Sequence, residues 1–212
     1  METAELERLR SVLLSVPDGG RDGECAVREY LRENLIPASV MFPIVLRDDA
    51  PQVLLTRRTC HLRDHPGQIC FPGGRADPED ASPAHTALRE VWEETGISSD
   101  RIEVIGYLPD RRTVTGFRIT PVVAFIRPPF ELNPDAFEVA DIFEAPLAFL
   151  LDAANHHVIP RPGKENPLFS IAFGSRRIWG ATAGIIRALS ERLAAAPSPP
   201  DTLPHVDEGR EN

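Results

Sequence analysis

Residues 89–97 read Arg-Glu-Val-Trp-Glu-Glu-Thr-Gly-Ile, and this stretch determines how the rest of the chain is interpreted. At about 100° per residue, an α-helix places Glu90, Glu93 and Glu94 within roughly a third of its circumference. Three ionised carboxylates this close repel one another unless a cation lies between them, and hard oxygen ligands favour Mg²⁺ or Mn²⁺. The stretch therefore predicts metal-assisted chemistry with these glutamates as ligands.

The predicted helix has clear ends. Ser82 is a suitable N-cap, Pro83 stands where a missing N–H costs nothing, and Gly96 provides a left-handed C-terminal residue, so the helix should cover residues 83–95. The side opposite the glutamates should pack on a core, and it carries Trp92. Core packing is also the interpretation for Trp179, at the start of a closing helix.

Arg89 stands beside Glu90 and four residues before Glu93, where its guanidinium can hold the carboxylates in place. The alternative interpretation is a solvated helix face stabilised by such ion pairs. The upstream segment 71–80, Phe-Pro-Gly-Gly-Arg-Ala-Asp-Pro-Glu-Asp, favours a functional site. Its paired glycines let backbone carbonyls approach a metal or phosphate, so the Gly74 carbonyl is a candidate ligand.

Together these residues resemble the Nudix hydrolase box: Gly, five residues, Glu, seven residues, Arg-Glu, an aliphatic residue, any residue, Glu-Glu, any residue, Gly, an aliphatic residue. Residues 89–97 match every fixed position. The first half departs, because the acid is Asp80 and eight residues separate it from Arg89. This departure resembles members of the coenzyme A pyrophosphatase branch. Residues 54–74, Leu-Leu-Thr-Arg-Arg-Thr-Cys-His-Leu-Arg-Asp-His-Pro-Gly-Gln-Ile-Cys-Phe-Pro-Gly-Gly, are similar to the signature preceding the box in that branch.

The resemblance covers about residues 36–192 and implies an α/β (α+β) Nudix fold, a mixed β-sheet between helices. The residues agree with this fold. Apolar, β-branched runs predict a hairpin and further short strands, and a closing helix should follow. The strands are expected at 39–47, 52–57, 104–108, 119–126, 138–143 and 168–173, and the helix at 179–194.

The domain organisation follows from composition. Residues 1–35 are expected to form a helical extension that packs on the domain, with Leu6, Leu9, Leu13 and Leu14 at helical spacing and a second helical stretch over 26–34. Residues 36–195 are expected to form the Nudix domain that the resemblance implies. Residues 196–212 are proline-rich and acidic at the end, and are expected to be disordered.

The net charge of −9 disfavours nucleic acid as the main partner. No run approaches the roughly twenty apolar residues of a membrane span, and no secretory signal segment is evident, so a cytoplasmic protein is expected. The three cysteines, Cys25, Cys60 and Cys70, fit a reducing compartment and disfavour a disulfide scaffold or zinc site. The sequence leaves the oligomeric state open, a homodimer included.

A small anionic substrate needs only a local basic patch, and cations gather around the glycine loop. Arginine binds phosphate in a bidentate way, so these residues are candidate substrate ligands, although each alone also fits a solvated surface charge. The candidates are Arg57, Arg58, Arg63, His65 and Arg75.

The predicted reaction is hydrolysis of a pyrophosphate bond. The metal would be held by Glu90, Glu93, Glu94 and the Gly74 carbonyl, while Arg89 orients the glutamates and a carboxylate, Glu93 or Glu94 among the candidates, takes a proton from water. The resemblance implies coenzyme A or a derivative as substrate, giving 4′-phosphopantetheine and adenosine 3′,5′-bisphosphate. Two alternatives stay open: another nucleoside diphosphate derivative, such as NADH or a nucleotide sugar, and a catalytically silent nucleotide-binding module. Glu138 could be a further metal ligand or an ordinary strand-end acid.

Overall fold

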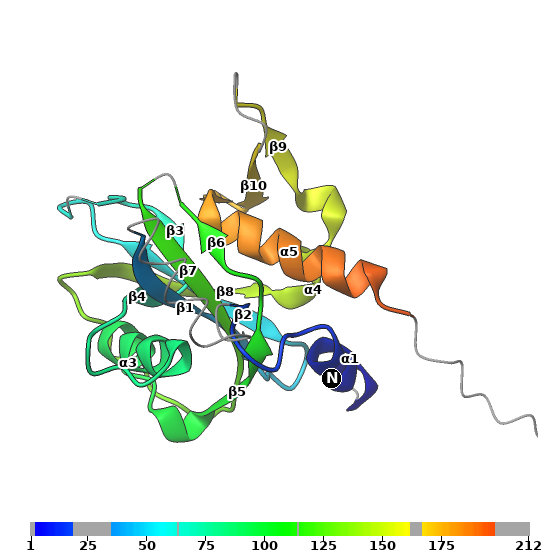
Figure 1. Ribbon diagram of the computed structural model, residues 1–212, viewed down its shortest axis with the longest axis horizontal. Helices are drawn as coiled ribbons and strands as arrows, with labels where there is room; N and C mark the ends of the chain where they lie inside the picture. Colours follow the sequence, from blue (N-terminus) through cyan, green and yellow to red (C-terminus); the bar gives the residue numbers. More distant parts are fainter. Residues whose placement is uncertain (1–2, 19–34, 63, 114, 162–166, 198–212) are drawn as a thin grey trace, which may run out of the picture.

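A computed structural model describes residues 3–18, 35–62, 64–113, 115–161 and 167–197 (Figure 1). Within these ranges, eleven strands form a single mixed sheet, and helices cover both of its faces. This arrangement confirms the predicted fold class. No helix in the described ranges is long and apolar enough to cross a membrane.

The centre of the sheet is the predicted hairpin. Strand β1 (Ile36–Val45) runs antiparallel to β2 (Gln52–Arg58), with Ile44 opposite Val53. On its other side β1 runs parallel to β7 (Phe117–Ile126), and β4 (Gly73–Arg75) pairs with the first half of β1. Strands β5 (Ile102–Tyr107) and β6 (Arg111–Arg112) extend the sheet beyond β7.

The sheet continues beyond β2. Strand β8 (Val139–Pro146) pairs with most of β2, and β3 (Ile69–Cys70) pairs with its end. From β3 the order runs to β11 (Arg176–Trp179), β10 (Leu168–Phe173) and β9 (His157–Ile159). Strands β3, β4, β6, β9 and β11 were not predicted, because two to four residues are too few to show a period-2 pattern.

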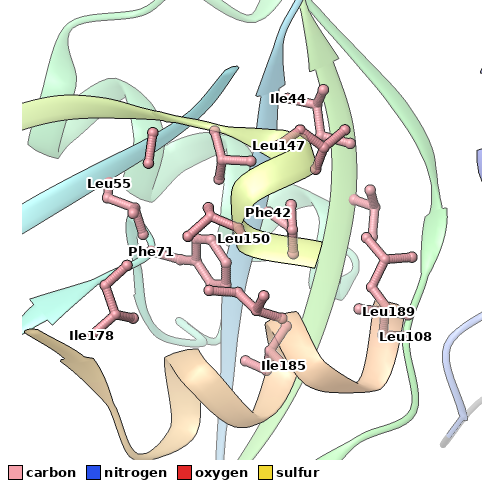
Figure 2. Close-up of a cluster of buried hydrophobic side chains, with 14 of the residues drawn as sticks. Phe42, Ile44, Leu55, Phe71, Leu108, Leu147, Leu150, Ile178, Ile185 and Leu189 are labelled. Atoms are coloured by element: carbon pink, nitrogen blue, oxygen red, sulfur yellow. The ribbon is translucent and has the colours of Figure 1, made fainter. Parts of the chain in front are cut away.

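Strand β1 separates two apolar layers because its side chains alternate between faces. Met41 and Val45 pack with the core under α3 (Pro83–Thr95). Phe42 and Ile44 point to the opposite layer, which is covered by α4 (Leu147–Leu151) and α5 (Ala181–Ala195) (Figure 2). Short 3₁₀ turns span Ser99–Arg101 and Ala153–Asn155.

Both tryptophan predictions were wrong. Trp92 is 57% exposed, because the buried side of α3 is centred on Ala87, Val91 and Glu94 and is therefore rotated towards the glutamates. Trp179 is 40% exposed and ends strand β11 instead of opening a helix. Its neighbour Ile178 is fully buried, and adjacent strand residues point to opposite faces.

The N-terminal segment contacts the domain through apolar side chains. Helix α1 (Thr3–Ser11) places Leu9 in the core on the α5 side, where it is 2% exposed. The helix ends before Leu13, earlier than predicted, and Leu14 instead forms a β-bridge with Tyr107 of β5. The helix expected over 26–34 and the tail expected to be disordered, apart from residues 196 and 197, lie outside the described residues.

Candidate functional site

The helix that carries the glutamates has the ends predicted for it. The Ser82 hydroxyl accepts a hydrogen bond from the His85 backbone N–H (3.2 Å). Gly96 adopts the left-handed conformation (φ 76°), and its N–H donates to the Trp92 carbonyl (2.9 Å). These caps satisfy otherwise unpaired backbone groups at both ends. The helix therefore begins at Pro83 and ends at Thr95, as the sequence predicts.

Arg89 is the most densely hydrogen-bonded side chain of the site. Its Nη1 donates to Glu90 and Glu93, each at 2.9 Å, which confirms the predicted orienting contacts. Its Nη2 donates to the Arg75 carbonyl and to Asp80 Oδ2, each at 3.0 Å, and its Nε donates to Asp80 Oδ1 at 3.3 Å. The bidentate bond from Arg89 lowers the pKa of Asp80 to about 2. Asp80 thus anchors the arginine that orients the glutamates.

Glu90 lies directly against the glycine strand. A Cβ added to Gly74 would come within 2.5 Å of the Glu90 Oε1 atom, so glycine is required for this approach. Gly73 meets a second constraint, because its φ of 155° and a clash 2.4 Å from the Ser39 carbonyl both exclude a side chain. Burial raises the pKa of Glu90, against the opposing effect of Arg89. The paired glycines therefore allow a half-buried carboxylate to sit on a strand.

Glu94 is the most buried of the three glutamates, at 4% exposure. Burial raises the pKa of its carboxyl to about 8, and the neighbouring charge of Glu90 adds to the effect. Arg58 and a hydrogen bond from the Gly73 backbone act in the opposite direction. Within the described part of the chain, its Oε2 atom is buried and has no hydrogen-bond partner. Ionising this carboxyl without a partner for its buried oxygen is costly, and a bound cation would remove that cost.

The three carboxylates are not converged into a ready-made cage. Among the described residues, no group of three or more His, Cys, Asp or Glu side chains has the arrangement of a metal site. Glu93 is 53% exposed and held by Arg89, whereas Glu90 and Glu94 lie between the helix and β4. The unpartnered Glu94 oxygen beside a second desolvated carboxylate nevertheless fits a hard divalent cation. Glu93 would become a further ligand if its carboxylate gave up its hydrogen bond with Arg89 and turned to the ion.

Glu138, which the sequence left undecided, belongs to this group. Its carboxylate lies 4.0 Å from the Arg58 guanidinium, and its charge raises the pKa values of Glu90 and Glu94. Cys70 lies on the same side, and burial raises the pKa of its thiol to about 11. The sequence offered only a weak signal for Glu138, since an acidic residue before a strand is common. Its proximity depends on β8 pairing with β2, which brings position 138 beside position 58.

The predicted substrate-binding residues are spread over both faces of the sheet. Arg58 faces the glutamates, whereas Arg57 is in register with Ile69 of the α5-side core and so occupies the other face. Arg75 and His65 are exposed, and His65 has a positive φ of 55°. Arg63 lies outside the described residues. Substrate contacts of these five residues stay predictions.

Comparison with known proteins identifies the family. The NUDIX domain family matches residues 35–161. Over 162 residues the chain is 42% identical to the uncharacterized Nudix hydrolase NudL of Enterobacter sp. (strain 638), covering 76% of this chain and 84% of that protein. The NudL of Escherichia coli (strain K12) is similar to the same extent.

Solved structures are more distant. The Ap4A hydrolase binary complex of C. elegans shows a TM-score of 0.46 at 16% identity, covering 52% of this chain and 80% of that one. The NUDIX domain of Shewanella oneidensis NrtR, complexed with ADP ribose, shows 0.43 at 24% identity, covering 58% and 85%. Likeness at this level adds nothing to the assignment, which rests on the family match and the NudL identity. The chain belongs to the Nudix hydrolase family.

Proposed function

We propose that this chain hydrolyses the pyrophosphate bond of coenzyme A or a derivative, with Mg²⁺ or Mn²⁺, giving 4′-phosphopantetheine and adenosine 3′,5′-bisphosphate. Membership of the Nudix hydrolase family implies the coarser activity, pyrophosphohydrolysis of a nucleoside diphosphate derivative. The observation that carries the metal requirement is the buried, unpartnered Glu94 oxygen beside Glu90. The coenzyme A assignment is supported by the signature over residues 54–74.

The residues of the site divide the work. Glu90, Glu94 and the Gly74 carbonyl would hold the cation, and Glu93 would join them if its carboxylate left Arg89. A divalent ion held there would supply positive charge against the phosphates and would lower the pKa of water bound to it. Arg89, fixed by Asp80, keeps the glutamates in position, and the carboxylate of Glu93 or Glu94 accepts the proton of the attacking water.

The positive side chains account for an anionic substrate in an acidic protein. Arg58 lies at the edge of the cluster of glutamates, where a phosphate can replace Glu138 as its partner. Arg63, His65 and Arg75 complete the proposed substrate contacts, whereas Arg57 lies on the opposite face of the sheet and its substrate contact stays a prediction. A cytoplasmic location fits the free thiols of Cys60 and Cys70. Homodimerisation stays a prediction.

A panel of diphosphates with product masses as the readout tests this proposal. Coenzyme A, an acyl derivative, NADH and a nucleotide sugar are incubated with Mg²⁺ or Mn²⁺. We expect preferential cleavage of coenzyme A between its phosphates. Equal or better turnover of the other compounds would refute the coenzyme A assignment. Absence of cleavage for every compound would refute the hydrolase proposal and favour the catalytically silent binding module.

One substitution separates catalysis from folding. Glu93→Gln removes one metal-held charge and should lower turnover by at least about 100-fold while the circular dichroism spectrum is retained. The matched control is Glu191→Gln, which changes an exposed glutamate on α5 paired with Arg187. The control should keep wild-type turnover. Unchanged turnover in Glu93→Gln would contradict the assigned role.

A further inference from the structure

Two exposed aromatic rings lie beside the cluster formed by Glu90, Glu94 and Glu138. The His61 and Phe137 rings lie 4.7 Å apart between centroids, at an interplanar angle of 59°. Both residues are exposed, and Phe137 reaches 64%, the highest value among the large hydrophobic residues described. An exposed aromatic ring offers a π-face on which a nucleic-acid base can stack.

The backbone holds Phe137 firmly in this exposed position. The Phe137 carbonyl accepts from the Thr59 hydroxyl (2.8 Å), and its N–H donates to the Asp135 carboxylate (2.9 Å). The next residue, Glu138, accepts from the Thr59 N–H (2.9 Å). The turn is also tied to the end of α3, because the Asn133 N–H donates to the Thr95 carbonyl (2.8 Å). The backbone that carries the ring is therefore held in place, which reduces the conformational freedom that binding would cost.

The aromatic pair is continuous with the charged part of the site. The same two segments form the Arg58–Glu138 ion pair. Arg58 lies three residues before His61, and Glu138 directly follows Phe137. Three residues of chain reach at most about 10 Å, so the rings lie within a short span of Arg58. A flat heteroaromatic group joined to a phosphate by a sugar would place its charge near Arg58 and its ring on Phe137.

We propose that Phe137, supported by His61, is the stacking platform for the base of the substrate, and adenine in particular. This inference rests on the proposed function, since it assigns one end of the nucleoside diphosphate. Aromatic rings stack on any base through their π-faces, so the platform adds affinity without taking part in the chemistry. Phe137 thus lowers KM and leaves kcat unchanged, as expected for binding that is equal in ground and transition states.

Binding of adenosine 5′-monophosphate and of ribose 5-phosphate, measured by calorimetry without turnover, tests the platform. We expect Phe137→Ala to weaken the nucleotide by about 5- to 10-fold, the lower part of the range for base stacking because the platform stays open to solvent. Ribose 5-phosphate should bind both proteins equally. Phe137→Trp should restore the nucleotide affinity. Val158→Ala, which changes a residue on β9 that is 57% exposed, should alter the binding of neither ligand.

Other results would overturn the proposal. Unchanged nucleotide affinity in Phe137→Ala removes the platform, and equal weakening of both ligands shows that the substitution disturbs the phosphate contacts instead. A change in oligomeric state by size-exclusion chromatography would assign the rings to a subunit interface. These outcomes are separate from failure of the proposed function, which is the absence of diphosphate cleavage by the unaltered protein.

Discussion

The buried Glu94 makes the stability of the metal-free protein depend on pH. Its pKa lies at about 8 in the folded chain and near 4.5 in an exposed carboxyl. Between these values the folded state keeps a proton that the unfolded state has lost, so stability falls as pH rises. The penalty is absent below 4.5 and complete above about 8. Each pH unit within the window costs about 1.4 kcal/mol, so passing from pH 5 to pH 7.5 costs about 3 kcal/mol.

Urea unfolding at these two pH values, with chelator present and circular dichroism as the signal, measures the effect. The wild-type free energy of unfolding should fall by about 3 kcal/mol more than that of Glu94→Gln, which keeps the side-chain shape and does not titrate. Mg²⁺ should restore wild-type stability at the higher pH and have a smaller effect at the lower one. Glu191→Gln, with its exposed carboxylate, is the control. Parallel profiles for wild type and Glu94→Gln would refute the reasoning.

Three further substitutions test other parts of the structure. Gly74→Ala places a Cβ against the Glu90 carboxylate and should lower turnover by at least about 10-fold without unfolding the protein; wild-type turnover would contradict the close packing. Asp80→Asn weakens the anchor of Arg89 and should cost about 10-fold in turnover, with unchanged kinetics as the contrary result. Leu9→Ala should destabilise the fold by about 2–4 kcal/mol in urea unfolding, whereas a negligible loss would show that α1 does not support the core.

The fold could be predicted where local signals were strong. The caps at Ser82 and Gly96 define α3 without reference to the rest of the chain, and its bounds agree with the structure. The exposure of Trp92 could not be predicted, because the helix packs where the glycine strand admits Glu90 and Glu94, and that strand is only three residues long. Periodicity alone therefore placed Trp92 on the buried side of α3, which was wrong.

The candidate site could also be predicted only where the signals were local. The contact of Arg89 with Glu93, four residues on, follows from helical spacing, and the predicted contact with the adjacent Glu90 is also present. The role of Glu138 depends on pairing between β2 and β8, residues about eighty positions apart, and spacing carries no such information. Arg57 and Arg58 look equivalent in sequence, yet strand alternation places them on opposite faces of the sheet.

The most direct test of the account is a crystal of the protein soaked in Mn²⁺ and measured at a wavelength that shows its anomalous signal. We predict a peak between the carboxylates of Glu90 and Glu94, beside the Gly74 carbonyl, with Glu93 turned away from Arg89 towards the ion. An anomalous map without a peak at these carboxylates, with Glu90 and Glu93 still bound to Arg89, would contradict the central claim.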